Sequence, residues 1–307
     1  MSAELLQYRA WRGGFREPIF ASWPIARVAL KMIFRRKLFW VLYALALLMF
    51  FMYFFGQYLL AWAESQADES GIQVLPGTKT APGDLIQLLR GAFHLDGRQG
   101  TMYLNFFGFQ GYMVMIVLAL AGSLLIGNDF QFGSLSFYLS KPISRVHYLL
   151  GKALAVAVFV NLMTTVPAIV LWVQFGLLDS WSFFYQKLDL LLGIVAYGLV
   201  LTVCLSAMLL AAATWVRRTV PLIMTWCTLF FFLRMLSGAM VFVLDMDPRW
   251  RLMDIWNNTY CVGTWLLQEQ PGIRQPAVGW AVAVLITVCT LCVMYLSMRI
   301  RAVEVVK

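Results

Sequence analysis

Six long apolar runs constrain this chain more than any other feature of its sequence. Five of them contain no charged residue, and the sixth, residues 219–244, contains only Arg234. Each run exceeds the roughly 20 apolar residues that a helix needs to cross the hydrocarbon core of a bilayer. With 61% hydrophobic and 13% charged residues, the chain cannot be a water-soluble domain. The sequence therefore predicts an all-α membrane protein with six transmembrane helices.

The whole chain, residues 1–307, is predicted to form one transmembrane domain. We place the spans at residues 38–62, 106–127, 145–173, 188–214, 219–243 and 278–298. The segments between and around them are an N-terminal segment 1–37, an outer loop 63–105, a cytoplasmic loop 128–144, an outer segment 244–277 and a tail 299–307. Within the outer loop, Asp84–Leu89 is predicted to form a short helix.

The distribution of Lys and Arg predicts the orientation. The side that holds both termini carries sixteen Lys and Arg, and the opposite side carries seven. Short loops rich in Lys and Arg stay on the cytoplasmic side, so both termini are predicted to be cytoplasmic. The net charge of +9 then reflects topology and attraction to anionic lipid, and not a nucleic-acid-binding surface.

A basic amphipathic helix is predicted before the first span. Ser22 can act as its N-cap and Pro24 lies in its first turn. Arg27, Lys31 and Arg35 follow at intervals of four residues, on one face, while the apolar residues Ile25, Val28, Ala29, Met32 and Ile33 line another. This pattern is typical of a helix that lies in the membrane interface with its cations toward the headgroups.

The loop between the second and third spans is unusually aromatic. It contains Phe130, Phe132, Phe137 and Tyr138, with Asp129 as the only charge in its first half. Pro142 disfavours helix immediately before it. So many aromatic side chains indicate that the segment packs on something, either the headgroup layer as an amphipathic helix or another protein.

An acidic residue after a span, then Gly, an apolar patch, Pro-x-Ser-Arg and Gly-Lys resembles the ABC-2 type transporter permease family. The residues that carry this resemblance are Asp129, Gly133, Leu135, Leu139, Pro142, Ser144, Arg145, Gly151 and Lys152. The family more often has Glu at the position of Asp129.

The resemblance implies a coupling helix in this loop that docks into a separate ATP-binding subunit, and an elbow helix before the first span. The residues that would form the docking site are Asp129, Phe130, Gln131, Phe132, Gly133, Ser134, Phe137, Pro142 and Arg145. It also implies short re-entrant helices within 244–277, a second permease copy (the same chain or a close paralogue), and ATP and Mg bound by the partner alone. The expected location is the bacterial cytoplasmic membrane.

The chain lacks the motifs that would make it an enzyme. No G-x-x-x-x-G-K-[ST], H-E-x-x-H or G-x-S-x-G occurs, and two histidines cannot build a histidine-rich metal centre. Of the five cysteines, only Cys261 lies outside the predicted spans, so they form no disulfide framework. We expect no cofactor or metal on this chain, and ATP hydrolysis in a separate subunit.

Arg234 is the one charge well inside a predicted span. A charge at that depth is costly and usually faces a wet cavity or the protein interior, although a long side chain can also reach outward to the headgroups. Counted from the cytoplasmic ends, Gln110 and Asn161 lie at a similar depth on neighbouring spans. We therefore predict a transport path lined by Arg234 with Gln110 or Asn161.

These features together favour the permease subunit of an ATP-driven exporter. The alternative is a membrane anchor or assembly scaffold that binds an ATPase without moving a solute.

Overall fold

The computed structural model describes residues 22–66, 72–75, 78–80, 82–91, 94–122, 145–216 and 218–299. Within these residues, six helical stretches are long and apolar enough to cross a membrane, which confirms the prediction of an all-α membrane protein. They are α2 (Lys37–Ser65), α4 (Gly100–Gly122), α7 with α8 (Arg145–Met163 and Thr165–Asp179), α10 (Leu188–Trp215), a fifth segmented stretch and α14 (Val278–Arg299).

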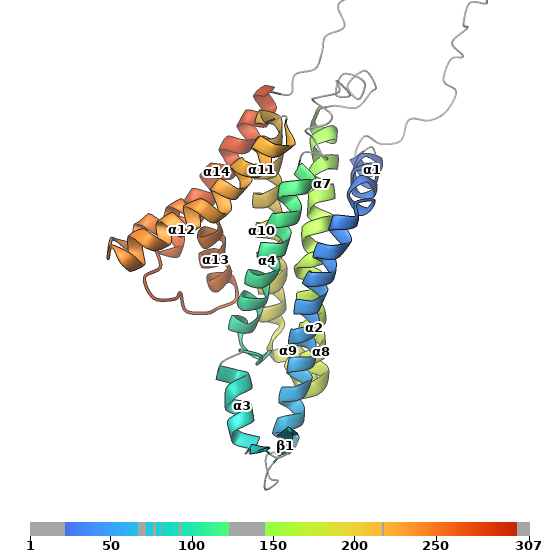
Figure 1. Ribbon diagram of the computed structural model, residues 1–307, viewed down its shortest axis with the longest axis vertical. Coiled ribbons are helices and arrows are strands. Elements are labelled where there is room, and N and C mark those ends of the chain that lie inside the picture. Colours follow the sequence, from blue (N-terminus) through green and yellow to red (C-terminus); the bar gives the residue numbers. More distant parts are fainter. Residues whose placement is uncertain are drawn as a thin grey trace, which may run out of the picture.

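The bundle has two distinct ends (Figure 1). At one end α1 (Ser22–Phe34) lies beside the start of α7, and at the other end are α3 (Pro82–Gly91) and a short hairpin. The hairpin pairs β1 (Ile72–Leu75) with β2 (Thr78–Thr80) in antiparallel register. The helix predicted at Asp84–Leu89 is confirmed by α3, whereas the hairpin was not predicted.

The α1 helix packs along α7. A Cβ atom at Gly151 of α7 would lie 2.8 Å from the Cβ of Ile25, so the two backbones approach as closely as glycine allows. Ser22 is the first residue of α1, and its hydroxyl donates to the carbonyl of His147 on α7 (3.2 Å). As the sequence pattern predicted, the exposed face carries the cations and the buried face is apolar, although Val28 is exposed.

Two helix boundaries depend on long-range contacts. The α4 helix begins at Gly100, ahead of the predicted start at 106, and a carboxylate oxygen of Glu269 accepts the N–H of Thr101 at 3.0 Å. This contact satisfies a first-turn donor that has no partner within the helix. The third span continues through α8 to Asp179 with a break at Thr164, where Pro167 removes a backbone donor.

The fifth membrane-capable stretch is segmented. It consists of α11 (Thr219–Cys227), the π-helix η3 (Thr228–Phe232), α12 (Leu233–Gly238) and the π-helix η4 (Ala239–Val243). The indole of Trp226 donates to the carbonyl of Met115 at 3.0 Å, which holds α11 against α4. Farther along, the helix diverges from the bundle (Figure 1).

The angle left by this divergence is filled by two short helices, η5 (Pro248–Met253) and α13 (Ile255–Leu266). The α13 helix contacts α4, α10 and α14. Much of it is buried, including the polar side chains of Asn257, Asn258, Thr259 and Thr264. The segment 244–277 therefore belongs to the packed domain.

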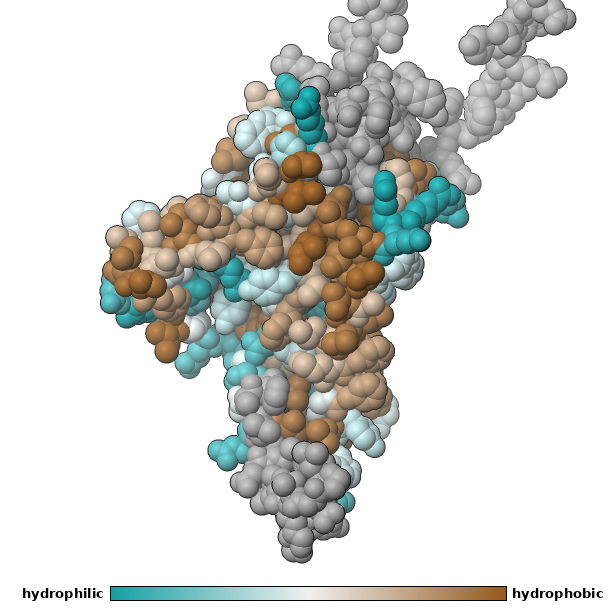
Figure 2. Space-filling view, viewed as in Figure 1, coloured by the Kyte–Doolittle hydropathy of each residue, from teal (hydrophilic) through white to brown (hydrophobic). Residues whose placement is uncertain are grey.

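The outer faces of the bundle are apolar, and hydrophobic side chains cover much of the face seen in Figure 2. The most hydrophobic windows of α2 and α14 are only 17% buried, compared with 67% for α10. The α10 helix is thus the centre of the bundle, while α2 and α14 present their side chains to lipid or to another chain.

Candidate functional site: a charged aromatic cavity

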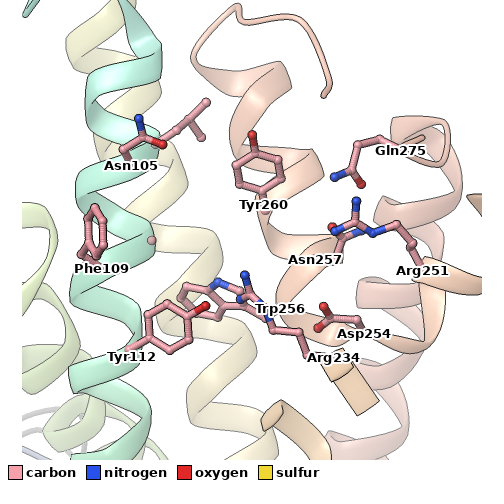
Figure 3. A pocket seen from close by; sticks show the side chains of 12 residues that line it. Asn105, Phe109, Tyr112, Arg234, Arg251, Asp254, Trp256, Asn257, Tyr260 and Gln275 are labelled. Carbon is pink, nitrogen blue, oxygen red and sulfur yellow. The ribbon is translucent and has the colours of Figure 1, made fainter. Parts of the chain in front are cut away.

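A cavity of about 350 Å³ lies among α4, α12, η5 and α13 (Figure 3). The α4 helix contributes Asn105, Phe109 and Tyr112, and the fifth stretch contributes Arg234. The rest of the wall comes from the segment between the last two spans: Arg251, Asp254, Trp256, Asn257, Tyr260 and Gln275. The site is therefore aromatic on one side and charged on the other, which is suited to a ligand with apolar and polar parts.

Close packing of glycines fixes the position of α13. A Cβ at Gly111 of α4 would lie 2.1 Å from the ring of Trp256, so only glycine leaves room for this indole. On the other side, Gly193 of α10 faces the carbonyl of Leu266, where a Cβ would lie at 2.5 Å. These contacts hold the cavity wall that bears Asp254 and Trp256 against the centre of the bundle.

Arg234 points into the cavity and not toward lipid. The carbon at the centre of its guanidinium group lies 5.2 Å from the ring centroid of Tyr112, a cation–π contact. Its Nη1 is buried without a hydrogen-bond partner. Figure 3 shows Arg234 extending from α12 toward Trp256 and Tyr112. The snorkelling alternative is therefore not the conformation of this side chain.

Asp254 is the most deeply buried charge in the cavity, with 1% of its surface exposed. Its Oδ1 has no hydrogen-bond partner. Burial raises the pKa of this carboxyl above its ordinary value, because desolvation outweighs the opposing effects of nearby backbone N–H groups and of Arg234 and Arg251. No ion pair joins Asp254 to either arginine in the part of the chain that the structure describes.

Arg251 supplies the second cation. Burial lowers the pKa of its guanidinium, and the field of Asp254 opposes that effect. Its guanidinium carbon lies 5.1 Å from the ring centroid of Phe242, and its Nε is buried without a partner. Two cations and one carboxylate thus share a cavity in which several of their polar atoms remain unsatisfied.

Polar contacts hold the surrounding backbone in place. The amide of Asn258 donates to the carbonyl of Leu252 (2.9 Å), which joins α13 to η5. Arg274 donates to the carbonyl of Val241 at 2.8 Å and pairs with Asp245 at 2.6 Å, which joins the end of η4 to the segment before α14. The elements around the cavity are thereby connected through their ends.

Comparison with known families identifies this architecture. Residues 23–250 match the family described as ABC-2 family transporter protein. The chain belongs to the ABC-2 family. A search of curated proteins found no match. Membership makes this chain an integral membrane protein and a permease of an ABC transporter, and it implies association with an ATP-binding subunit.

The structure does not bring together the three polar residues predicted for the transport path. Gln110 of this ABC-2 protein donates to the carbonyl of Ala46 at 2.8 Å and faces α2. Asn161 donates to the hydroxyl of Thr202 at 2.8 Å and faces α10. Of the three, Arg234 lines the cavity. Equal depth on neighbouring helices does not place side chains on facing sides.

The docking residues predicted between 129 and 142, namely Asp129, Phe130, Gln131, Phe132, Gly133, Ser134, Phe137 and Pro142, lie outside the described residues. Arg145 is the first residue of α7.

Sequence reasoning missed Arg251, Asp254 and the aromatic residues around them as site residues. The available signal was a polar stretch, Asp245–Asp254, followed directly by Trp256 and Tyr260, in the segment that adjoins the span containing Arg234.

Proposed function

We propose that this chain is the permease subunit of an ATP-driven ABC-2 exporter. It forms the translocation path and couples to a separate subunit that binds ATP and Mg. The observation that carries the proposal is the cavity between α4, α12 and α13, where a buried aspartate and two half-buried arginines, each with one buried polar atom that lacks a partner, lie beside aromatic side chains. A chain that only anchored an ATPase would have no need for such a site, because unsatisfied buried charges destabilise the protein.

In this proposal both termini are cytoplasmic, the chain resides in the bacterial inner membrane, and two copies pair with two ATP-binding subunits. Each ATP-binding subunit docks on residues 128–142 and beside α1. The packing of α1 on α7 supports this route, since residues 128–142 lead into α7. A movement of the loop would then displace α1 and the third span together.

The docking step is tested with the full chain co-expressed with candidate ATP-binding subunits from neighbouring genes. We expect Phe130→Ala and Phe137→Ala to reduce co-purification of the subunit, because an aromatic anchor buried at an interface contributes strongly to affinity. Trp181→Ala, at the exposed first residue of the short helix α9 (Trp181–Gln186), is the control. Normal co-purification by both phenylalanine variants would overturn docking and leave a helix that lies in the headgroup layer.

Exporter and scaffold differ in their response to solute. The purified complex in liposomes is mixed with L-phenylalanine, 2-phenylethanesulfonate or lysophosphatidylethanolamine, and ATP hydrolysis is measured. An exporter should hydrolyse ATP faster with at least one of these amphipathic probes. A rate of ATP hydrolysis that none of the three probes changes would favour the scaffold.

A further inference from the structure

Three residues that line the cavity, from three different elements, each have a buried polar atom without a hydrogen-bond partner. These atoms are Nη1 of Arg234 on α12, Nε of Arg251 on η5, and Oδ1 of Asp254 immediately before α13. Buried polar atoms in folded proteins nearly always have a partner, and leaving one without a partner is destabilising. Three such residues around one cavity of about 350 Å³ therefore indicate the chemistry of a ligand that a small shift of their side chains would satisfy.

The missing partners have a definite chemistry. The two guanidinium N–H groups require acceptors, and they favour an anionic acceptor because the cavity holds two cations and one carboxylate. The carboxylate oxygen of Asp254 accepts hydrogen bonds, so its partner must be a donor. The aromatic rings of Phe109, Tyr112 and Trp256 line the same space and suit an apolar body.

We infer that the cavity binds an amphipathic zwitterion, with its anionic group at Arg234 and Arg251, its protonated amine at Asp254 and its apolar part against the aromatic wall. The inference deepens the proposed function by naming the class of solute, and it can fail while that function stands, because binding is measured without the ATPase. The volume lies within the range of small-molecule sites, roughly 300–1,000 Å³.

The test compares three probes that share a phenylethyl body. L-phenylalanine carries both charges, 2-phenylethanesulfonate carries the anion alone and 2-phenylethylamine carries the cation alone. Binding to the purified full chain in dodecylmaltoside is measured by calorimetric titration. We expect L-phenylalanine to bind most tightly and 2-phenylethylamine most weakly. 1-Palmitoyl-lysophosphatidylethanolamine, which combines a zwitterionic head with an acyl chain, distinguishes a lipid source from a soluble one.

Two variants identify the groups involved. Arg251→Gln should weaken L-phenylalanine and the sulfonate by about tenfold, as expected for the loss of a charged hydrogen bond. The matched control is Arg249→Gln, because Arg249 lies in the same short helix with 75% of its side chain exposed. Asp254→Asn should remove the advantage of L-phenylalanine over the sulfonate.

The inference is overturned if neither L-phenylalanine nor the lysolipid binds. Equal binding of the three phenylethyl probes, or equal effects of Arg251→Gln and Arg249→Gln, would also overturn it. Tight binding of the lysolipid alone supports the zwitterionic site and places its occupant among lipids.

Discussion

Gly151 of α7 and Ile25 of α1 are in direct contact, and a Cβ at position 151 would lie 2.8 Å from the Cβ of Ile25. The sequence pattern indicated a helix in the membrane interface, and Gly151 was among the residues that carry the family resemblance. The structure shows that the two features belong to one contact. Through this contact, the N-terminal helix packs directly onto the third span.

This contact predicts the effect of a larger residue. Gly151→Leu should destabilise the protein by about 1–3 kcal/mol, the usual cost of overpacking, and should separate α1 from α7. Gly279→Leu on α14 is the control, since a Cβ there meets no atom within 4 Å. Thermal unfolding in detergent and protease cleavage near residue 35 measure the two effects. Equal melting temperatures for both variants would contradict the prediction.

The Lys and Arg distribution predicts which loops face outward. A cysteine at Gly77 should react with an impermeant thiol reagent added to intact cells, and a cysteine at Ser140 should react only after the membrane is opened. Native Cys261 should give little background, because none of its surface is exposed and its thiol contacts Gln275 at 3.3 Å. The reverse labelling pattern would invert the topology.

Arg234→Met should diminish the stimulation of ATP hydrolysis by L-phenylalanine. The substitution keeps much of the side-chain length but removes the cation over Tyr112. We expect half-maximal stimulation to need about tenfold more phenylalanine, as for a lost charged hydrogen bond. Arg249→Gln serves as the control. If L-phenylalanine stimulates ATP hydrolysis equally in the Arg234→Met variant and the unmodified chain, Arg234 does not line the transport path.

The raised pKa of Asp254 predicts a pH dependence. Because burial favours the neutral carboxyl, Asp254 takes up its proton at a higher pH than an exposed aspartate, whose pKa is about 3.9. As the pH falls through the pKa of Asp254, the cavity loses one negative charge. 2-Phenylethanesulfonate, which stays ionised, should then bind more tightly.

The expected gain is at least about threefold as the pH is lowered in steps from 8, since a like charge is removed from a poorly solvated site. Near Asp254, burial raises the pKa of the Tyr260 hydroxyl and raises that of the Cys261 thiol to about 11, so neither group loses its proton below pH 8. Asp254→Asn should bind the sulfonate equally at every pH in the series. A variant that retains the pH dependence would assign it to another group.

The six spans were predictable because a helix that crosses lipid must consist mainly of apolar residues, which the sequence shows directly. The described spans follow these apolar runs. Helix boundaries that depend on residues far away in the sequence were not predictable. The start of α4 is an example, because Thr101 meets Glu269, which lies far along the chain. No local pattern contains that information.

The candidate site was predictable only in part, for the same reason. Arg234 could be singled out because a charge within a span needs an explanation. The other residues around the cavity could not be predicted, because the depth of a residue along a helix does not specify which face its side chain occupies. Asp254 lies outside the spans, where a carboxylate is common, and its importance comes from its burial at the start of α13.

The two π-helical segments on either side of Arg234 have a geometric consequence. A π-helix accommodates one more residue per turn than its α-helical surroundings, and each residue of an α-helix rotates the chain by about 100°. If η3 relaxed to α-helix while α11 stayed fixed against Met115, everything beyond it would turn by about that angle. The guanidinium would then leave the ring of Tyr112 and face away from the cavity, although no rotamer had changed. The direction in which Arg234 points therefore depends on the helical register of the fifth span.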